Sequence, residues 1–193
     1  MGILNNVMPG DIMFARHVTP WEADSLIWAG QLFLGQPGYP HHVAVVVQAA
    51  KPMYGLSGIL RAGPRIVQAM PSGAEEIEID EDYATVDYAY LRPNYNFVLD
   101  QAGRTAEAAR SYIGTPYSFL DYGALTAHRL HLPVRNLDNF ISSSKHMICS
   151  QLADQAMSDG SFHVFTDGRL PQNVTPAALY ERLRALPGTI VVS

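Results

Sequence analysis

One cysteine and seven histidines carry the nucleophilic and basic chemistry open to this chain of 193 residues. Cys149 stands in the stretch "KHMICSQLADQAM", where an irregular serine-rich segment gives way to an amphipathic helix pattern. At the N-terminus of a helix, unpaired backbone N–H groups and the helix dipole favour an anion, so a thiol there can have a pKa well below about 8.5. The same N–H groups can stabilise the oxyanion that forms when a carbonyl is attacked. The position of Cys149 therefore indicates a nucleophile, against the competing interpretation of a small buried structural residue.

A thiol nucleophile also needs a base that exchanges protons near neutral pH, and histidine is that residue. His41 and His42 open the stretch "HHVAVVVQA", whose continuous β-branched run predicts a strand buried on both faces. His42 is in register with Ala44 and Val46, whereas His41 precedes the strand and is expected to face solvent. We therefore expect a rigid strand to hold His42 as the base.

A metal site is the other chemistry that histidines suggest. His128 and His131 are spaced i, i+3 and could be joined by His41 or His146. One cysteine and scattered histidines do not have the ligand spacing of a zinc site, so we expect no metal and no cofactor.

The elements that would position these residues follow from the apolar periodicity. Five stretches have the pattern of strands: "PGDIMFAR" with its apolar residues 12–15, "HHVAVVVQA", "RIVQAM", "AEEIEIDEDY" and "VDYAYLRP". Glycines in "YGLSGILRAGP" predict a loop between the second and the third. Helical patterns are found in "WEADSLIWAGQLFL" and, from residue 99 onward, in "LDQAGRTAEAARSYIG", "SFLDYGALTAHRLHL", "ICSQLADQAMSDG" and "TPAALYERLRALPG". This order predicts a single α+β domain over residues 1–193, with an antiparallel sheet of about five strands and helices on one side.

Two of these helices have a defined apolar face. In the helix that starts near residue 99, Ala102, Ala106, Ala109 and Ile113 recur on one side. In the cysteine helix, apolar residues recur at i, i+4 and i+8 counted from Ile148. We expect both faces to pack against the sheet.

Composition excludes several other classes of protein. Apolar residues make up 48% and charged residues 16% of the chain, as in globular proteins. A net charge of −5 with 13 Lys and Arg argues against a nucleic-acid binder. The first residues lack a basic segment followed by an apolar run, so no signal peptide is expected, and "SLIWAGQLFLG" is too short to span a bilayer. The expected location is cytoplasmic or phage-associated, without stable membrane insertion, and the pattern is silent on oligomeric state.

Several short motifs become informative when they are taken in order. "PGDIMFAR", "HHVAVVV", "VQAM", "YLRP", "GTPYSFLD" and "MICSQLADQAM" follow one another over about residues 9–157. This order resembles the circularly permuted papain-like thiol hydrolases of the NlpC type, whose relatives include lecithin:retinol acyltransferase. The histidine precedes the cysteine, the reverse of ordinary papain-like enzymes. The resemblance implies a small antiparallel sheet packed against a helix that bears the nucleophile.

Carried over residue by residue, the resemblance makes Cys149 the nucleophile and His42 the base. The group that orients the imidazole would be Gln68, where many relatives have a glutamate. A glutamine oxygen can still accept the imidazole N–H and fix the tautomer, as the amide of a Cys-His-Asn triad does. Tyr117 matches the tyrosine of a Gly-x-Pro-Tyr motif and could bind substrate. Asp11, in the Gly-Asp pair, is expected to make a structural hydrogen bond.

Other residues complete the expected site. Glu75, Glu76 and Glu78 are alternatives to the glutamine, although the acidic run "EEIEIDED" is more typical of a solvated sheet edge. Trp28 and His41 are expected to contribute to a substrate pocket rich in aromatic residues.

The expected function is hydrolysis of an amide bond by a cysteine-dependent enzyme. Cell-wall peptide hydrolysis is widespread among NlpC-type proteins, so the resemblance favours a cell-wall peptide. An apolar pocket would instead suit a lipid acyl hydrolase or acyltransferase. A third possibility is a non-catalytic binding or assembly module, because the glutamine departs from the acid of the family.

Overall fold

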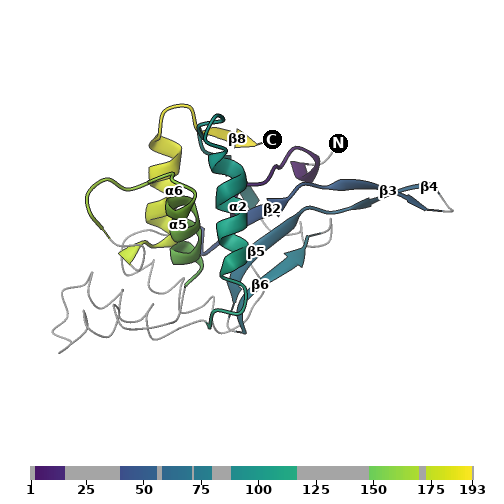
Figure 1. The fold of residues 1–193 in the computed structure, drawn as a ribbon, viewed down its shortest axis with the longest axis horizontal. Coiled ribbons are helices and arrows are strands. Elements are labelled where there is room, and N and C mark those ends of the chain that lie inside the picture. The colour runs from purple at the N-terminus through teal and green to yellow at the C-terminus, as the bar shows by residue number, and fades with distance from the viewer. Residues whose placement is uncertain are drawn as a thin grey trace.

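The structure, a computed structural model, describes residues 3–15, 40–55, 58–70, 72–79, 88–116, 148–169 and 173–192 (Figure 1). Its elements, in chain order, are a short 3-10 helix Ile3–Asn5, β1 Ile12–Ala15, β2 His42–Gln48, β3 Lys51–Gly55, β4 Gly58–Ala62, β5 Arg65–Met70, β6 Gly73–Glu78, β7 Tyr88–Arg92, α2 Gln101–Ser111, α5 Cys149–Asp159, α6 Pro176–Ala185 and β8 Ile190–Val192.

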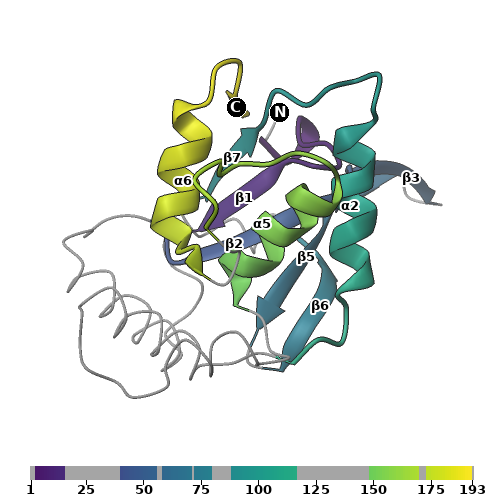
Figure 2. The same ribbon diagram turned by 60° about the vertical axis from the view of Figure 1, so that its left-hand side comes forward.

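Six of the eight described strands form one sheet in the order β6-β5-β2-β1-β7-β8. Every neighbouring pair in it is antiparallel. The three described helices α2, α5 and α6 lie together on one side of this sheet (Figure 2). The predicted α+β class is therefore confirmed. The sheet has one strand more than the five recognised, because β8 is only three residues long and "IVV" has no room for a visible alternation.

The sheet carries a hydrophobic core on each of its two faces. On the helix side, Val43, Val45 and Val47 of β2 pack in one cluster with residues of α2, α5 and α6. On the far side, Ala44 and Val46 belong to a second cluster that contains only residues outside the three helices. Because successive side chains of a strand point to opposite faces, residues 43–47 of β2 are all apolar. The prediction of a strand buried on both faces is confirmed.

The stretch "YGLSGILRAGP" was expected to be a loop, and this expectation is wrong. Residues 54 and 55 belong to β3 and residues 58–62 to β4, and the two strands pair antiparallel as a separate two-stranded sheet. The hairpin extends away from the main sheet, to the right in Figure 1. Gly55 pairs with Gly58, so two of the glycines that suggested a loop lie within the paired strands.

Helix α2 buries a different face from the predicted one. Ala106 and Ala109 are buried as expected, but Thr105 replaces Ala102 among the fully buried positions. Ile113 is 47% exposed, because the helix ends at Ser111 and the turn that follows carries Ile113 off its apolar face. In α5, the predicted inward residues 148, 152 and 156 are all buried.

The hydroxyl of Ser150 anchors the N-terminal turn of α5. Its Oγ donates to the carbonyl oxygen of Val174 at 2.7 Å, and both residues are fully buried. Val174 directly precedes Thr175, whose side chain accepts a hydrogen bond from Ala178 N and caps α6. The start of α5, with Cys149 as its first residue, is thus fastened to the start of α6.

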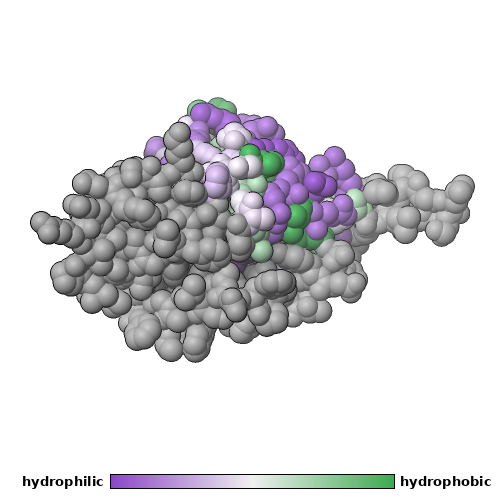
Figure 3. Space-filling model, turned by 90° about the horizontal axis from the view of Figure 1, so that it is seen from below, coloured by the Kyte–Doolittle hydropathy of each residue, from purple (hydrophilic) through white to green (hydrophobic). Residues whose placement is uncertain are grey.

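The surface of the described residues carries mainly polar side chains. Seen from below, it is mostly hydrophilic, and its apolar atoms form small separate groups (Figure 3). Among the described residues, none of the helices has both the length and the apolar character needed to cross a bilayer.

Replacing Ser150 by Ala should lower the free energy of unfolding by about 2 kcal/mol, because the buried Val174 carbonyl loses its donor. Chemical denaturation measures this. The matched control is Ser158→Ala on the same helix, since the Ser158 hydroxyl bonds to the exposed ring of His163. That change should stay within about 0.5 kcal/mol of the parent. Equal effects of the two substitutions would show that the Ser150 hydroxyl does not anchor α5.

Candidate functional site

A buried hydrogen bond joins two of the residues singled out in the sequence. His42 is the first residue of β2, and Gln68 on β5 lies directly opposite Ala44. His42 and Gln68 are therefore diagonal neighbours on the far side of the sheet. The Nε2 atom of His42 lies 2.8 Å from Oε1 of Gln68, and the residues are only 4% and 2% exposed. The expected contact between imidazole and amide oxygen is present.

A second hydrogen bond extends this pair to the edge strand β6. Glu75 lies directly opposite Gln68 in the β5–β6 ladder, and Gln68 Nε2 donates to Glu75 Oε1 at 3.1 Å. Three polar side chains on three neighbouring strands thus form one line, His42–Gln68–Glu75. The sequence offered Glu75 as an alternative to Gln68, but the structure places it behind Gln68. A cross-strand partner of this kind becomes visible only when the register is known.

The other acids of β6 have different partners, so this edge is more than a solvated acidic run. Glu76 points to the other side of the strand, where its two oxygens pair with Arg65 at 2.6 Å and Arg110 at 3.2 Å. These ion pairs hold the pKa of Glu76 below its ordinary value, although partial burial opposes them and is the largest single influence. Glu78 is exposed, and its carboxylate accepts a hydrogen bond from the backbone of Gly63 at 2.8 Å.

Burial decides the charge of the imidazole. It lowers the pKa of His42 from its ordinary 6.5 to about 4, and the hydrogen bond to Gln68 offsets only part of this effect. His42 is therefore neutral at pH 7, with one nitrogen protonated and the other a proton acceptor. A neutral imidazole is the form that a general base requires.

The thiol of Cys149 lies beside the residue that precedes His42. Cys149 is the first residue of α5, follows the extended residue Ile148 and is 2% exposed. Its Sγ lies 4.0 Å from the carbonyl oxygen of His41. Helix α5 packs on β2 and β5, so the helix N-terminus is held at the end of the sheet where β2 begins.

The structure brings the predicted residues together to different degrees. His42 and Gln68 are in direct contact. Cys149 packs on the helix side with Val43, whereas His42 follows the alternation of the far side, so the thiol and the imidazole approach the start of β2 from two sides. The contact between the sulfur and the His42 imidazole stays a prediction.

His41 does not face solvent, contrary to expectation. It is 7% exposed, its backbone N–H donates to the carbonyl of Ala15 at 2.9 Å, and its own carbonyl faces the thiol. The β1–β2 ladder thus reaches back as far as His41 and buries it at the end of the sheet.

Several predicted residues cannot be placed. Trp28, Tyr117, His128, His131 and His146 lie outside the described residues. Within the parts of the chain that are described, no group of three or more His, Cys, Asp or Glu is arranged to hold a metal ion.

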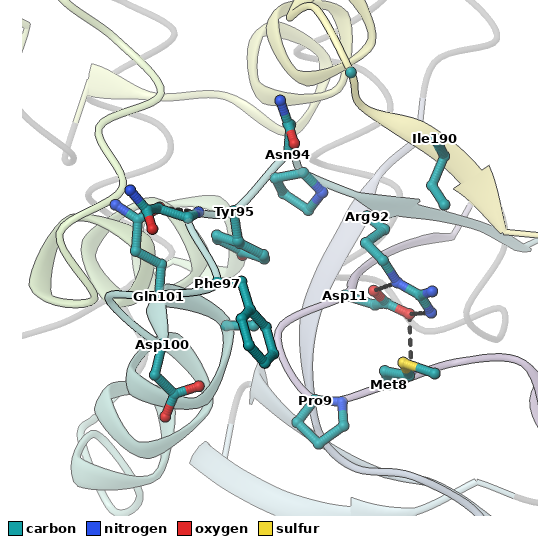
Figure 4. Close-up of a pocket in the computed structure, with 14 residues that line it drawn as sticks. Met8, Pro9, Asp11, Arg92, Asn94, Tyr95, Phe97, Asp100, Gln101 and Ile190 are labelled. Atoms are coloured by element: carbon teal, nitrogen blue, oxygen red, sulfur yellow. Dashed lines mark hydrogen bonds and ion pairs between the residues drawn. The ribbon is translucent and has the colours of Figure 1, made fainter.

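Asp11 makes structural contacts, as expected, at the opposite end of β1 from the strand end that pairs with His42. Its carboxylate accepts the backbone N–H of Met8 at 2.8 Å and forms an ion pair with Arg92 at 2.7 Å (Figure 4). The carboxylate supports the positive charge of Arg92, which raises the pKa of the guanidinium.

A cavity of about 330 Å³ lies next to this ion pair. It is lined by the loop before β1, the chain after β7, the start of α2 and the turn before β8, and Tyr95 and Phe97 contribute its aromatic side chains (Figure 4). The residues that line it include no cysteine and no histidine. The cavity is therefore separate from the site around His42.

Comparison with known proteins adds a likeness of fold. No protein-family model matches this sequence, and a search of curated proteins finds no match. Among solved structures, the chain is similar to the crystal structure of metalloprotein yiiX from Escherichia coli O157:H7, DUF1105, with a TM-score of 0.54 and 15% sequence identity. The similarity covers 97% of both chains. At this identity the two proteins share a fold over nearly their whole lengths.

The lowered pKa of His42 predicts a pH dependence of stability. Between pH 6.5 and about 4, the unfolded chain binds a proton at His42 that the folded chain does not, so stability is lost as the pH falls through this range. The total loss of folding free energy over this pH range is about 3 kcal/mol. Denaturation at several pH values should show a smaller loss in His42→Gln than in the parent. The control His163→Gln, which changes an exposed histidine, should retain the parent's loss. A His42→Gln curve parallel to the parent's would contradict a buried neutral imidazole.

Proposed function

We propose that this chain is a cysteine-dependent hydrolase of the circularly permuted papain-like type, in which Cys149 is the nucleophile, His42 the base and Gln68 the group that orients the base. One observation carries the proposal: a buried neutral imidazole is held by Gln68 at the start of β2, one residue away from the backbone carbonyl that faces the thiol. The chain order of histidine strand, glutamine strand and cysteine helix supports the permuted fold, as does the packing of α5 on β2 and β5.

The proposed reaction uses both nitrogens of the imidazole. Nε2–H donates to Gln68, so Nδ1 takes the proton of the Cys149 thiol. The thiolate attacks the carbonyl carbon of an amide, and the backbone N–H groups at the start of α5 stabilise the oxyanion. Collapse of this intermediate breaks the C–N bond, and the imidazolium protonates the departing amine. Water then gives a proton to Nδ1, attacks the acyl-enzyme and releases a carboxylic acid and the thiol.

The proposed substrate is a cell-wall peptide. The argument for it is the order of motifs that the chain shares with NlpC-type enzymes. Acyl transfer or hydrolysis of a lipid amide or ester would use the same thiol and base, so a test of substrate must include both classes.

Incubation with a peptidoglycan digest, and separately with acyl amides and esters, tests the proposal. The digest should be cleaved, and mass spectrometry should find an acyl adduct on Cys149, the chain's one cysteine. Cys149→Ala should lower kcat/KM at least about a thousandfold, because the covalent step is lost. Turnover of the lipid substrates alone would show that the enzyme is a lipid acyl hydrolase or acyltransferase and not a cell-wall peptidase. If neither substrate class is turned over and the thiol stays unreactive at pH 6 until the protein unfolds, the protein is a non-catalytic binding module and the proposal is wrong.

The two neighbouring histidines provide a matched control. His42→Gln should lower kcat by about a hundredfold or more, because the base is lost. His41→Gln should keep kcat, since the atom of His41 that faces the thiol is its backbone carbonyl, which the substitution retains. A contribution of the His41 side chain to the substrate pocket would change KM instead. The reverse result would make His41 the base.

Substitution of Gln68 tests the orienting role separately. Gln68→Glu should preserve or raise kcat, because a carboxylate accepts the Nε2–H hydrogen bond. The carboxylates at positions 68 and 75 would share one proton, so the pair keeps a negative charge that stabilises the imidazolium. Gln68→Ala should lower kcat by roughly a hundredfold, the lower end of what base catalysis contributes. Steady-state kinetics of both variants measure this. If both match the parent, another residue orients His42.

A further inference from the structure

The amide of Gln68 can face His42 in two ways, and only one of them suits a base. The two ends of an amide have nearly the same shape, but one is an acceptor oxygen and the other a donor NH₂ group. If the oxygen faces His42, Nε2 must carry the ring hydrogen and Nδ1 has the lone pair. If the NH₂ group faced His42, Nδ1 would carry the hydrogen and could not take a proton from a thiol. A glutamate at this position, as in many relatives, would not have this ambiguity.

Glu75 removes the ambiguity from the other end of the amide. It lies directly opposite Gln68 in the β5–β6 ladder, and its Oε1 lies 3.1 Å from Gln68 Nε2. An ionised carboxylate only accepts hydrogen bonds, so it selects the NH₂ end of the amide. The oxygen must then face His42, where the distance to Nε2 is 2.8 Å. Because a carbonyl oxygen also only accepts, Nε2 is the protonated nitrogen.

We propose that Glu75 is a positioning residue, whose carboxylate fixes the Gln68 amide and thereby holds His42 as the Nε2–H tautomer. Its effect on catalysis rests on the proposed function, whereas its effect on the tautomer does not. Glu75 also brings a negative charge within two hydrogen bonds of the imidazole. The charge that a glutamate would supply at position 68 is thus supplied one strand further out.

The neighbouring acid shows that this arrangement depends on the face of the strand. Glu76 is adjacent in sequence, but alternation turns it to the other side, where Arg65 and Arg110 neutralise it. Glu75 therefore differs from its neighbour in contacting a side chain that contacts the base.

The direct test is the tautomer of His42, read from the ¹⁵N chemical shifts of its imidazole at pH 7. The parent should be predominantly Nε2–H. In Glu75→Gln, a neutral amide can offer either end to Gln68, so a substantial share of the Nδ1–H tautomer should appear. The matched control is Glu78→Gln, which removes one charge from the same strand while its amide oxygen can still accept from Gly63. This control should leave the tautomer unchanged.

Kinetics give the second readout. Glu75→Gln should lower kcat about fivefold with KM unchanged, an effect of the size of one hydrogen bond. In a protein that already carries Gln68→Glu, Glu75→Gln should leave kcat unchanged. Both oxygens of a carboxylate accept hydrogen bonds, so the side chain at position 68 then has no amide orientation to be fixed.

The outcomes separate the two proposals. An inactive chain whose tautomer still shifts in Glu75→Gln would overturn the proposed hydrolase and support the positioning role. An unchanged His42 tautomer in Glu75→Gln would overturn the positioning role, whether or not the parent is active. A loss of kcat that is as large in the Gln68→Glu background would also overturn it, since Glu75 would then act by another route.

Discussion

The buried hydrogen bond between His42 and Gln68 is the interaction on which the rest of this arrangement depends. An imidazole as buried as that of His42 must satisfy its polar atoms, or burial would cost more than the fold gains. The bond ties β2 to β5 at the end of the sheet where the thiol lies. It also determines the chemistry of the ring, because burial keeps His42 neutral and the partner of Nε2 decides which nitrogen accepts a proton.

The polar side chains at the two ends of β1 are stabilised in different ways, by an ion pair at one end and by a hydrogen bond between neutral groups at the other. At one end, Asp11 and Arg92 form an ion pair that closes the turn into the strand, and a carboxylate that is 1% exposed is stable there because a guanidinium and a backbone N–H satisfy it. At the other end, His42 and Gln68 form a hydrogen bond between two neutral side chains, with the charge of Glu75 one strand away. A neutral pair can be buried within the sheet, where a full charge would carry a larger desolvation cost.

The thiol of Cys149 is held by contacts that are independent of this network. Ser150 fastens the first turn of α5 to Val174, and the apolar face of α5 packs on the helix-side cluster. The thiol and the imidazole are thus fixed from two layers of the fold, the thiol by helix packing and the imidazole by a hydrogen bond within the sheet. Because the two sets of contacts are separate, each side chain can be held rigidly without distorting the position of the other.

The sequence by itself determined the elements whose signal is local. The buried run of β2 and the apolar repeat of α5 are each encoded within about ten residues, and both were predicted correctly. Gln68 could be named as the partner of His42 only through a family resemblance, because no local pattern relates residues on different strands. Glu75 behind Gln68, the burial of His41 and the pairing of the hairpin β3–β4 were decided by the tertiary structure. The physical reason is register: a shift of one residue would turn every side chain of a strand to the other face, and only the assembled sheet selects which residues meet.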